Sequence, residues 1–191
     1  MRSCRTPGSV RGVLGNQHPY RDRHHWPEGD NMDVRLATLN DAEIISALNA
    51  EVQKAHAEAL PHLFKPVSPE TFPASFVRQL LTDPDTCIFI GSLHGEPVGY
   101  IYAQIIKRPE TALRHAWERL HIHHISVNRT QQRRGCGHAL IQAVVQFAKA
   151  HGITTMTLDV WSFNTQARSF FATQGFTVYN ENMWLDVSGQ E

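Results

Sequence analysis

Apolar positions in this chain recur with two periods, one typical of strands and one typical of helices. Short β-branched and aromatic runs predict strands at residues 32–38 (MDVRLAT), 86–93 (TCIFIGSL), 97–106 (PVGYIYAQII), 119–127 (RLHIHHISV) and 154–160 (TTMTLDV). The turn His94-Gly95-Glu96 separates the second and third runs, which are therefore expected to form a hairpin. Residues 176–187 (FTVYNENMWLDV) are expected to add the closing strands.

Apolar residues spaced three and four apart predict helices between these strands, within residues 40–52, 69–81, 137–152 and 164–175. The first is expected to begin at Asn40, which would form a capping-box-like pair with Glu43. The third (GHALIQAVVQFAKAHG) has the clearest pattern, and Gly152 stands where a helix commonly ends. Alternating strands and helices indicate an α/β (mixed α+β) domain.

Residues 1–31 differ from the rest of the chain because they follow neither period. They are rich in Gly, Pro, Arg and His, so this segment is expected to be a disordered N-terminal extension, with the folded domain spanning residues 32–188. A transit peptide would be amphipathic, which the early prolines and glycines disfavour. The five arginines within residues 1–31 are offset by Asp22, Glu28 and Asp30, which weakens the interpretation of this segment as a nucleic-acid-binding tail.

Composition excludes several classes of protein. The 191 residues include 18 Lys and Arg and 18 Asp and Glu, so no global field favours nucleic acid or an anionic membrane as partner. Cys4, Cys87 and Cys136 are few and scattered, which suits a reducing compartment and a cytoplasmic location better than a disulfide framework.

Basic charge gathers in the turn Gln132-Arg133-Arg134-Gly135-Cys136-Gly137, between a predicted strand and a predicted helix. The first amides of a helix lack internal partners, so this turn is suited to bind a phosphate. Gly135 and Gly137 are expected to let the backbone approach it closely. The turn is not a Walker A loop, and it is not a dinucleotide fingerprint, because Leu140 stands where the last glycine of GxGxxG belongs. By itself, such a turn is also compatible with an ordinary loop.

The turn and its preceding strand resemble the [QR]xxGx[GA] motif of the GCN5-related N-acetyltransferases (GNAT). A second block agrees with the same family: Leu158-Asp-Val160, Asn164, Ala167, Phe171 and Gly175-Phe176. The opening MDVRLATLNDAEIISALN is also similar to the family's first strand and helix. The resemblance implies a central mixed, mostly antiparallel sheet with helices on both faces.

The resemblance also implies an acetyl-CoA site and no metal. The backbone of Ile125, Ser126 and Val127 would pair with the pantetheine arm, and Asn164 would contact the cofactor near its thiol. The turn would hold the pyrophosphate through Gln132, Arg133, Arg134, Gly135, Cys136, Gly137 and His138. Phe171 takes a cofactor-contacting position that often holds a tyrosine, the proposed general acid, so that acid is in doubt; Ser162 and Tyr179 are weaker candidates.

The strand at residues 119–127 carries three histidines. Alternation places His121 and His123 on one face of the strand and His124 on the other. For any one of them, packing in the core or at an edge is the ordinary role of a strand histidine. The first two resemble the His-x-His pair of arylalkylamine N-acetyltransferases, and imidazole is suited to accept a proton from an amine near neutral pH. A metal site is disfavoured because only two share a face, whereas catalytic zinc takes three protein ligands.

These observations predict an acetyl-CoA-dependent N-acetyltransferase in which a primary amine attacks the thioester directly. The acceptor is expected to be a small amine in a pocket lined from His56, His62, Phe64, Tyr100 and Tyr102, with a peptide terminus or lysine as the alternative. Two other classes stay open: a non-catalytic acyl-CoA-binding module and a metal-dependent hydrolase. Cys136 is expected to be exposed, and a homodimer is left open.

Overall fold

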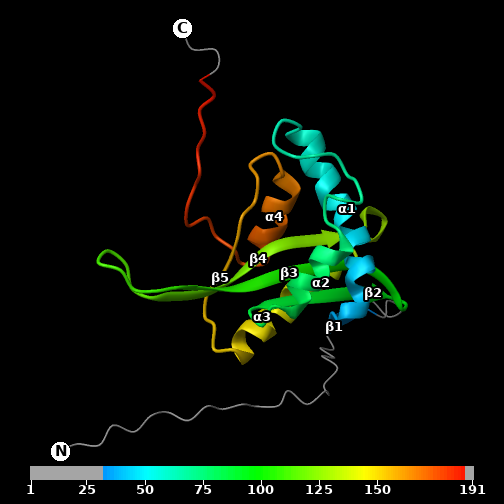
Figure 1. Ribbon diagram of the computed structural model, residues 1–191, viewed down its shortest axis with the longest axis horizontal. Coiled ribbons are helices and arrows are strands. Elements are labelled where there is room, and N and C mark those ends of the chain that lie inside the picture. The colour runs from blue at the N-terminus through cyan, green and yellow to red at the C-terminus, as the bar shows by residue number, and fades with distance from the viewer. Residues whose placement is uncertain (1–31, 188–191) are drawn as a thin grey trace, which may run out of the picture.

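A computed structural model describes residues 32–187 (Figure 1). The expected disordered extension at residues 1–31 lies outside the described residues, as do residues 188–191. Within residues 32–187, no helix is both long and apolar enough to cross a membrane.

The centre of the fold is a five-stranded sheet with the order β1-β2-β3-β4-β5. The strands are β1 (Met32–Leu36), β2 (Thr86–Leu93), β3 (Glu96–Arg108), β4 (Trp117–Val127) and β5 (Met156–Leu158). All neighbours are antiparallel except the last pair, in which β4 and β5 are parallel. The expected mixed, mostly antiparallel sheet is therefore confirmed.

The turn between β2 and β3 shows why the sequence specifies this hairpin. His94 and Gly95 both have positive φ, 53° and 87°. A two-residue turn of this kind matches the right-handed twist of the flanking strands, and it requires glycine or a residue that tolerates the left-handed region. The predicted hairpin is confirmed.

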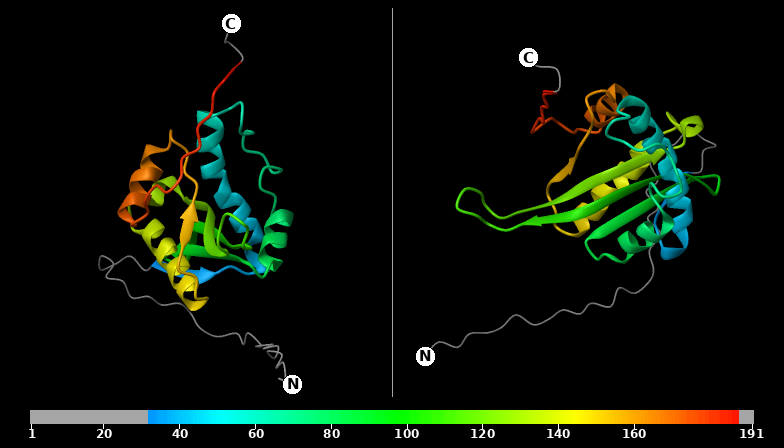
Figure 2. Two further views of the ribbon diagram at one scale, coloured as in Figure 1. Left: turned by 90° about the vertical axis from the view of Figure 1, so that its left-hand side faces the viewer. Right: turned by 45° about the horizontal axis from the view of Figure 1, so that its top comes forward.

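Within residues 32–187, four α-helices cover the sheet: α1 (Ala42–Ala59), α2 (Ala74–Thr82), α3 (Cys136–Ala150) and α4 (Thr165–Thr173). α1 and α2 lie on one face, and α3 and α4 lie on the other (Figure 2, left). Gly152, with φ of 70°, and Gly175, with φ of 89°, follow the ends of α3 and α4 in the left-handed region.

The start of α1 differs from the expectation. The capping box is formed by Thr38 and Asp41 around the short 3₁₀ helix Leu39–Asp41, and not by Asn40 and Glu43. Asp41 also accepts two hydrogen bonds from the Arg35 guanidinium, at 2.7 and 2.9 Å. That guanidinium holds the pKa of Asp41 well below its usual range, so the ion pair fixes the cap two residues before the position that the sequence favoured.

The two faces of the sheet have different cores. Towards α3 the buried residues are apolar and include Leu120, Leu140 and Val144, each with no exposed surface. Towards α1 and α2 the core contains Ile45, Ile90 and Tyr100, and the hydroxyl of Tyr100 has polar partners within it.

One irregularity in β4 governs the position of its histidines. Tyr102 lies opposite His124 and Ala103 opposite Ile122, so His123 has no counterpart on β3. This extra residue is a β-bulge, which interrupts the alternation of side chains between the two faces.

The closing strands expected within residues 176–187 are absent from the described structure. Phe176 packs against the α3-side core, but Met183, Trp184 and Val187 are exposed beyond it. Alternating apolar residues favour a strand only where another strand pairs with them, and here the segment extends away from the sheet (Figure 1).

Candidate functional site

The parallel pair formed by β4 and β5 is short, and it separates beside the histidines. Its ladder runs from Leu120↔Met156 to Ile122↔Leu158. Within the described residues, β4 continues to Val127 without further ladder pairing to β5. The two strands therefore leave a stretch of β4 backbone with one unpaired edge.

Two hydrogen bonds identify which amides lie on that edge. The Leu120 N–H donates to the Thr155 carbonyl on the β5 side at 3.0 Å, whereas the Asn128 N–H donates to the Val98 carbonyl on the β3 side at 2.8 Å. Backbone groups alternate along a strand, so the N–H groups of Ile125 and Val127 point away from β3. Ser126, between them, faces α1 and donates its hydroxyl proton to the Leu48 carbonyl.

The unpaired edge leads into the glycine turn at the start of α3. Arg133 and Gly135 have φ of 62° and 81°, so the turn folds back on itself before the helix begins at Cys136. Gln132 donates to the Val127 carbonyl at 3.1 Å, which ties the turn to β4. The amide-rich N-terminus of a 15-residue helix therefore lies in continuation of the β4 edge.

Two residues of the turn pack against other parts of the structure. A Cβ on Gly137 would lie 3.0 Å from the ring of Phe170, so a larger residue there would require this ring of α4 to move. Cys136 is buried, with 1% of its surface exposed, and its thiol lies 3.6 Å from the Gln131 carbonyl. The expectation that this thiol is exposed was wrong, because the helix starts at Cys136 and turns its side chain inward.

The side chains of α4 are used structurally. Asn164 caps the helix by accepting a hydrogen bond from the Ala167 N–H at 3.0 Å. Phe171 is 7% exposed and packs against Phe170 and Phe176 in the core, where it offers no proton donor. Nδ1 of His138, in the first turn of α3, lies 2.7 Å from Oε1 of Gln174. This contact links the start of α3 to the end of α4.

The three histidines of β4 lie in one cluster of rings around Tyr102. His121 and His123 are 4.8 Å apart between centroids, as the shared face predicted. Tyr102 stacks on His123 at 4.7 Å and also meets His124 edge-on at 5.8 Å. The expectation that His124 points to the opposite face was wrong, because the bulge at His123 shifts the alternation by one residue.

The surroundings of all three histidines lower their pKa values, which favours the neutral ring. Desolvation lowers the pKa of His121, and the nearby carboxylate of Asp159, at 3.7 Å from Nε2, opposes that shift only in part. Desolvation and the neighbouring His121 lower the pKa of His123 to about 4. Burial likewise lowers the pKa of His124 to about 4. Each ring therefore keeps a lone pair that can accept a proton.

His124 differs from the other two because it belongs to a buried polar network. Asn49 of α1 donates to the Tyr100 hydroxyl at 2.8 Å, and that hydroxyl lies 3.1 Å from Nδ1 of His124. A Tyr100 hydroxyl that accepts from Asn49 can donate its own proton to Nδ1, an arrangement that would place the proton of His124 on Nε2. Tyr100 has no exposed surface, so the expectation that it lines an acceptor pocket was wrong.

An aromatic wall, which we define as His56, Phe64, Trp161 and Phe163, stands next to this cluster. Phe64 meets His56 at 4.9 Å and Trp161 at 5.3 Å, joining the segment after α1 to the loop between β5 and α4. Trp161 and Phe163 are 40% and 36% exposed. The sequence pointed to His56 and Phe64 but not to Trp161 and Phe163. The available signal was a pair of aromatic residues two positions apart, just before a predicted helix.

Electrostatic interactions link both segments that carry the wall to the histidines. The positive charge of a protonated His56 would disfavour protonation of His124, which contributes to its lowered pKa. Asp159, two residues before Trp161, lies near His121. His62, also expected at the site, instead stacks on Trp184 at 5.5 Å.

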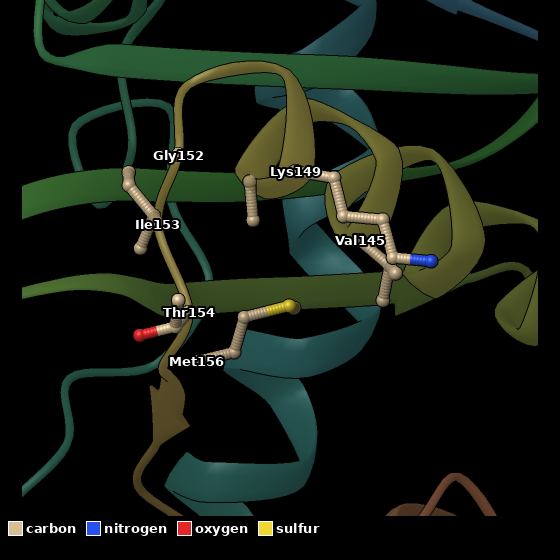
Figure 3. A pocket seen from close by; sticks show the side chains of 7 residues that line it. Val145, Lys149, Gly152, Ile153, Thr154 and Met156 are labelled. Atoms are coloured by element: carbon tan, nitrogen blue, oxygen red, sulfur yellow. The ribbon is translucent and has the colours of Figure 1, made fainter.

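A cavity of about 460 Å³ lies elsewhere (Figure 3). Val145, Lys149, Ile153 and Met156 line it at the C-terminal end of α3, whereas the glycine turn is at the N-terminal end of that helix. This cavity is therefore separate from the site. Among residues 32–187, no group of three or more His, Cys, Asp or Glu side chains is arranged to hold a metal ion.

The sequence profile of the acetyltransferase (GNAT) family matches residues 50–176. Among curated proteins, N-acetyltransferase family 8 member 3 of Mus musculus is 25% identical over 115 residues, covering 60% of this chain and 49% of that protein. N-acetyltransferase 8 of Homo sapiens is 25% identical over 103 residues, covering 54% and 44%. The chain spans about half the length of the curated relatives it matches.

Solved structures share the fold at lower identity. The BH1408 protein from Bacillus halodurans aligns with a TM-score of 0.77 and 21% identity, over 81% of this chain and 99% of that one. Aminoglycoside N-acetyltransferase AAC(6')-Iy, solved in complex with CoA, aligns with a TM-score of 0.66 and 19% identity, over 85% and 98%.

Proposed function

The chain belongs to the acetyltransferase (GNAT) family, and from that premise we propose that it is an acetyl-CoA-dependent N-acetyltransferase that acts on a small primary amine. One observation carries the proposal: the unpaired edge of β4 connects the three histidines to the glycine turn at the start of α3. A thioester bound along that edge would have proton acceptors at one end and phosphate-binding amides at the other.

The residues of the edge and the turn fit an elongated, phosphate-bearing cofactor. The N–H groups of Ile125 and Val127 are available to pair with the amide groups of a pantetheine arm, as an added strand would. The backbone from Arg133 to His138, at the positive end of α3, would hold the pyrophosphate. Acetyl-CoA, when bound, supplies the activated acetyl group.

The Ile125 amide is the edge donor closest to the histidines along the chain. In this position it would donate a hydrogen bond to the thioester carbonyl, whose oxygen gains negative charge during attack by the amine. Hydrogen bonds by the Ser126 side chain to α1 and by Gln132 to Val127 hold this part of the backbone in place. A fixed donor needs no reorganisation as that charge develops.

The histidine pair would accept the proton of the attacking amine. An amine is protonated at neutral pH and must lose a proton before or during attack on a carbonyl. The lowered pKa values of His121 and His123 favour neutral rings, and the two rings are in contact. The ring of His123 is partly desolvated by its neighbours, but the residue keeps exposed surface. The proton would pass to one of them directly or through water.

No side-chain acid is required for departure of the thiolate. Phe171 lacks a hydroxyl, and Tyr179 lies on the exposed C-terminal segment, 3.4 Å from Arg119. A thiol with a pKa near ~8.5 leaves as thiolate without great difficulty. We therefore propose that the thiolate leaves without a side-chain acid at position 171.

The aromatic wall supports a small acceptor with an apolar or aromatic body. Rings such as Trp161 and Phe163 gain free energy when a flat apolar surface covers them. The Asp159 carboxylate, 87% exposed beside His121, would attract the ammonium form of the amine. One solved structure with this fold is an aminoglycoside acetyltransferase in complex with sisomicin, a small molecule.

The experiment that tests the proposal is thermal unfolding of the full chain with and without acetyl-CoA, followed by an amine screen. At ~100 times its dissociation constant, acetyl-CoA should stabilise the protein by about 2.7 kcal/mol, a shift of several degrees. Arg133→Gly retains the left-handed backbone but removes the charge and should reduce the shift. Arg114→Gln, in the loop between β3 and β4, is the matched control.

The outcomes separate the candidate functions. A shift together with acetylation of small aromatic amines supports the proposal, whereas turnover only with peptides would assign a peptide acceptor. A shift without turnover on any amine would indicate the non-catalytic acyl-CoA-binding module, which the buried Phe171 in place of an acid keeps in consideration. No shift in folded protein would contradict the proposal.

A further inference from the structure

His123 is linked to a carboxylate through one intervening side chain. Its Nε2 lies 3.2 Å from Oε1 of Gln104 on β3. The Nε2 of the same Gln104 donates to Oδ2 of Asp83 at 3.0 Å. Asp83 lies directly after α2 and before β2. This chain of contacts therefore connects His123 to the face of the sheet that α2 covers.

The chemistry of Asp83 sets the direction of every hydrogen bond in the chain. A carboxylate only accepts, so Gln104 must present its NH₂ group to Asp83 and its carbonyl oxygen to His123. An amide oxygen also only accepts, and therefore Nε2 of His123 must carry the proton. The lone pair of the neutral ring is then on Nδ1.

Asp83 is itself held in one orientation. Its Oδ1 accepts from the Asp85 N–H at 2.9 Å, and its Oδ2 lies 3.3 Å from the Thr86 hydroxyl. Tyr102 stacks on the His123 ring with an interplanar angle of 19°, which fixes the plane of the imidazole. Both ends of the chain are therefore constrained by groups that are not part of it.

From this arrangement we infer that Gln104 and Asp83 are positioning residues, which hold His123 in the Nε2–H tautomer and make Nδ1 the atom that accepts a proton from the acceptor amine. The inference rests on the proposed function for the proton transfer, but the tautomer itself does not depend on it. None of the residues in the chain other than His123 would touch substrate.

The proton transfer balances within this geometry. An N–H bond of the amine breaks as an Nδ1–H bond forms, and the amine keeps the electron pair that forms the bond to the acetyl carbon. The imidazolium retains its Nε2–H bond to Gln104, whose amide dipole is oriented by Asp83 to favour that positive charge. The proton then passes from Nδ1 to solvent.

The test is to determine the tautomer of His123 by ¹⁵N NMR of the ring nitrogens in the full-length protein near pH 7. The native protein should show a protonated Nε2 and an unprotonated Nδ1. In Asp83→Asn the new amide can donate to Gln104, which lets Gln104 turn its NH₂ group to His123. The ring should then shift to the Nδ1–H tautomer, and kcat should fall about 10²-fold with KM little changed.

Asp85→Asn is the matched control. It removes the same charge two positions away, where the carboxylate pairs with Lys107 at 2.8 Å and does not contact Gln104. It should leave the tautomer and kcat unchanged. Gln104→Met provides a second variant, in which loss of the acceptor should give a mixture of tautomers even if Asp83→Asn fails to fold.

A native ring protonated on Nδ1, or spectra that are the same in the native protein, Asp83→Asn and Gln104→Met, would overturn the inference. The NMR spectra can be recorded whether or not the protein turns over an amine. Failure of the proposed function would instead appear as absence of an acetyl-CoA shift or of acetylation, whatever the tautomer is.

Discussion

The two faces of the sheet are built by different physical rules. Towards α3 the core consists of apolar side chains such as Leu120, Leu140 and Val144. Towards α1 and α2, buried polar groups are placed among the apolar ones, including Asn49 and Ser126. Each of these two has a specific hydrogen-bond partner, as buried polar groups require.

The difference shows how this fold separates stability from chemistry. Apolar packing on the α3 face is non-directional, and its free energy depends on area and fit. The α1 face instead depends on individual atoms, because each donor there orients a histidine or the β4 backbone. Substitutions on the first face should therefore change stability alone, and substitutions on the second should also change the hydrogen bonding or protonation of the histidines.

Leu140→Ala should give the largest effect and act on stability. The side chain has no exposed surface and lies in the centre of the α3-side core. Its truncation should lower the free energy of unfolding by about 4 kcal/mol, measured by urea denaturation. A loss below ~1 kcal/mol would mean that the α3 face is not the main source of stability.

The double variant His121→Ala with His123→Ala should act on the chemistry instead. Loss of both proton acceptors should lower kcat about 10²-fold or more while the shift with acetyl-CoA is retained. His151→Ala is the control, since this histidine stacks on Phe147 at the far end of α3. Unchanged turnover in the double variant would remove the histidine pair from the mechanism.

Tyr100→Phe should reveal the polar character of the α1 face with a change of one atom. Asn49 and His124 would lose the hydroxyl between them but lie close enough, at 3.4 Å, to restore part of the interaction. The free energy of unfolding should fall by about 1.5 kcal/mol. Tyr179→Phe, on the exposed C-terminal segment, should change it by less than ~0.5 kcal/mol.

The pH dependence of stability should be a gradual effect to which His124 contributes, together with His123, whose pKa is also about 4. The pKa of His124 is about 4 in the folded protein and near 6.5 when unfolded. Between these values the unfolded state binds more protons, so the free energy of unfolding falls as the pH falls from 6.5 towards 4. The loss from His124 between pH 7 and pH 5 should be roughly 2 kcal/mol.

His124→Gln isolates this contribution because His121 and His123 remain in the variant. The difference in unfolding free energy between the native protein and the variant, measured by urea denaturation at several pH values, should change over this range. A constant difference from pH 7 to pH 4.5 would show that His124 is not buried as a neutral group.

Local patterns in the sequence determined much of the fold. The hairpin followed from His94-Gly95, because a tight turn with positive φ depends on two residues. The regular spacing of apolar residues predicted α3, and Gly152 marked its end because glycine readily adopts the positive φ that ends many helices. The glycine turn was recognisable because a strand, a short basic loop and a helix are consecutive in the chain.

Contacts between distant segments decided the rest. The side of the sheet that His124 faces depends on a bulge in the pairing with β3. In the sequence the bulge corresponds to the doublet His123-His124, where the alternation of apolar and polar residues shifts by one position. The partners of Tyr100, and Trp161 beside Phe64, come from segments far apart in the chain. The last segment alternates like a strand, but a strand exists only where a neighbour binds it, and sequence does not specify that neighbour.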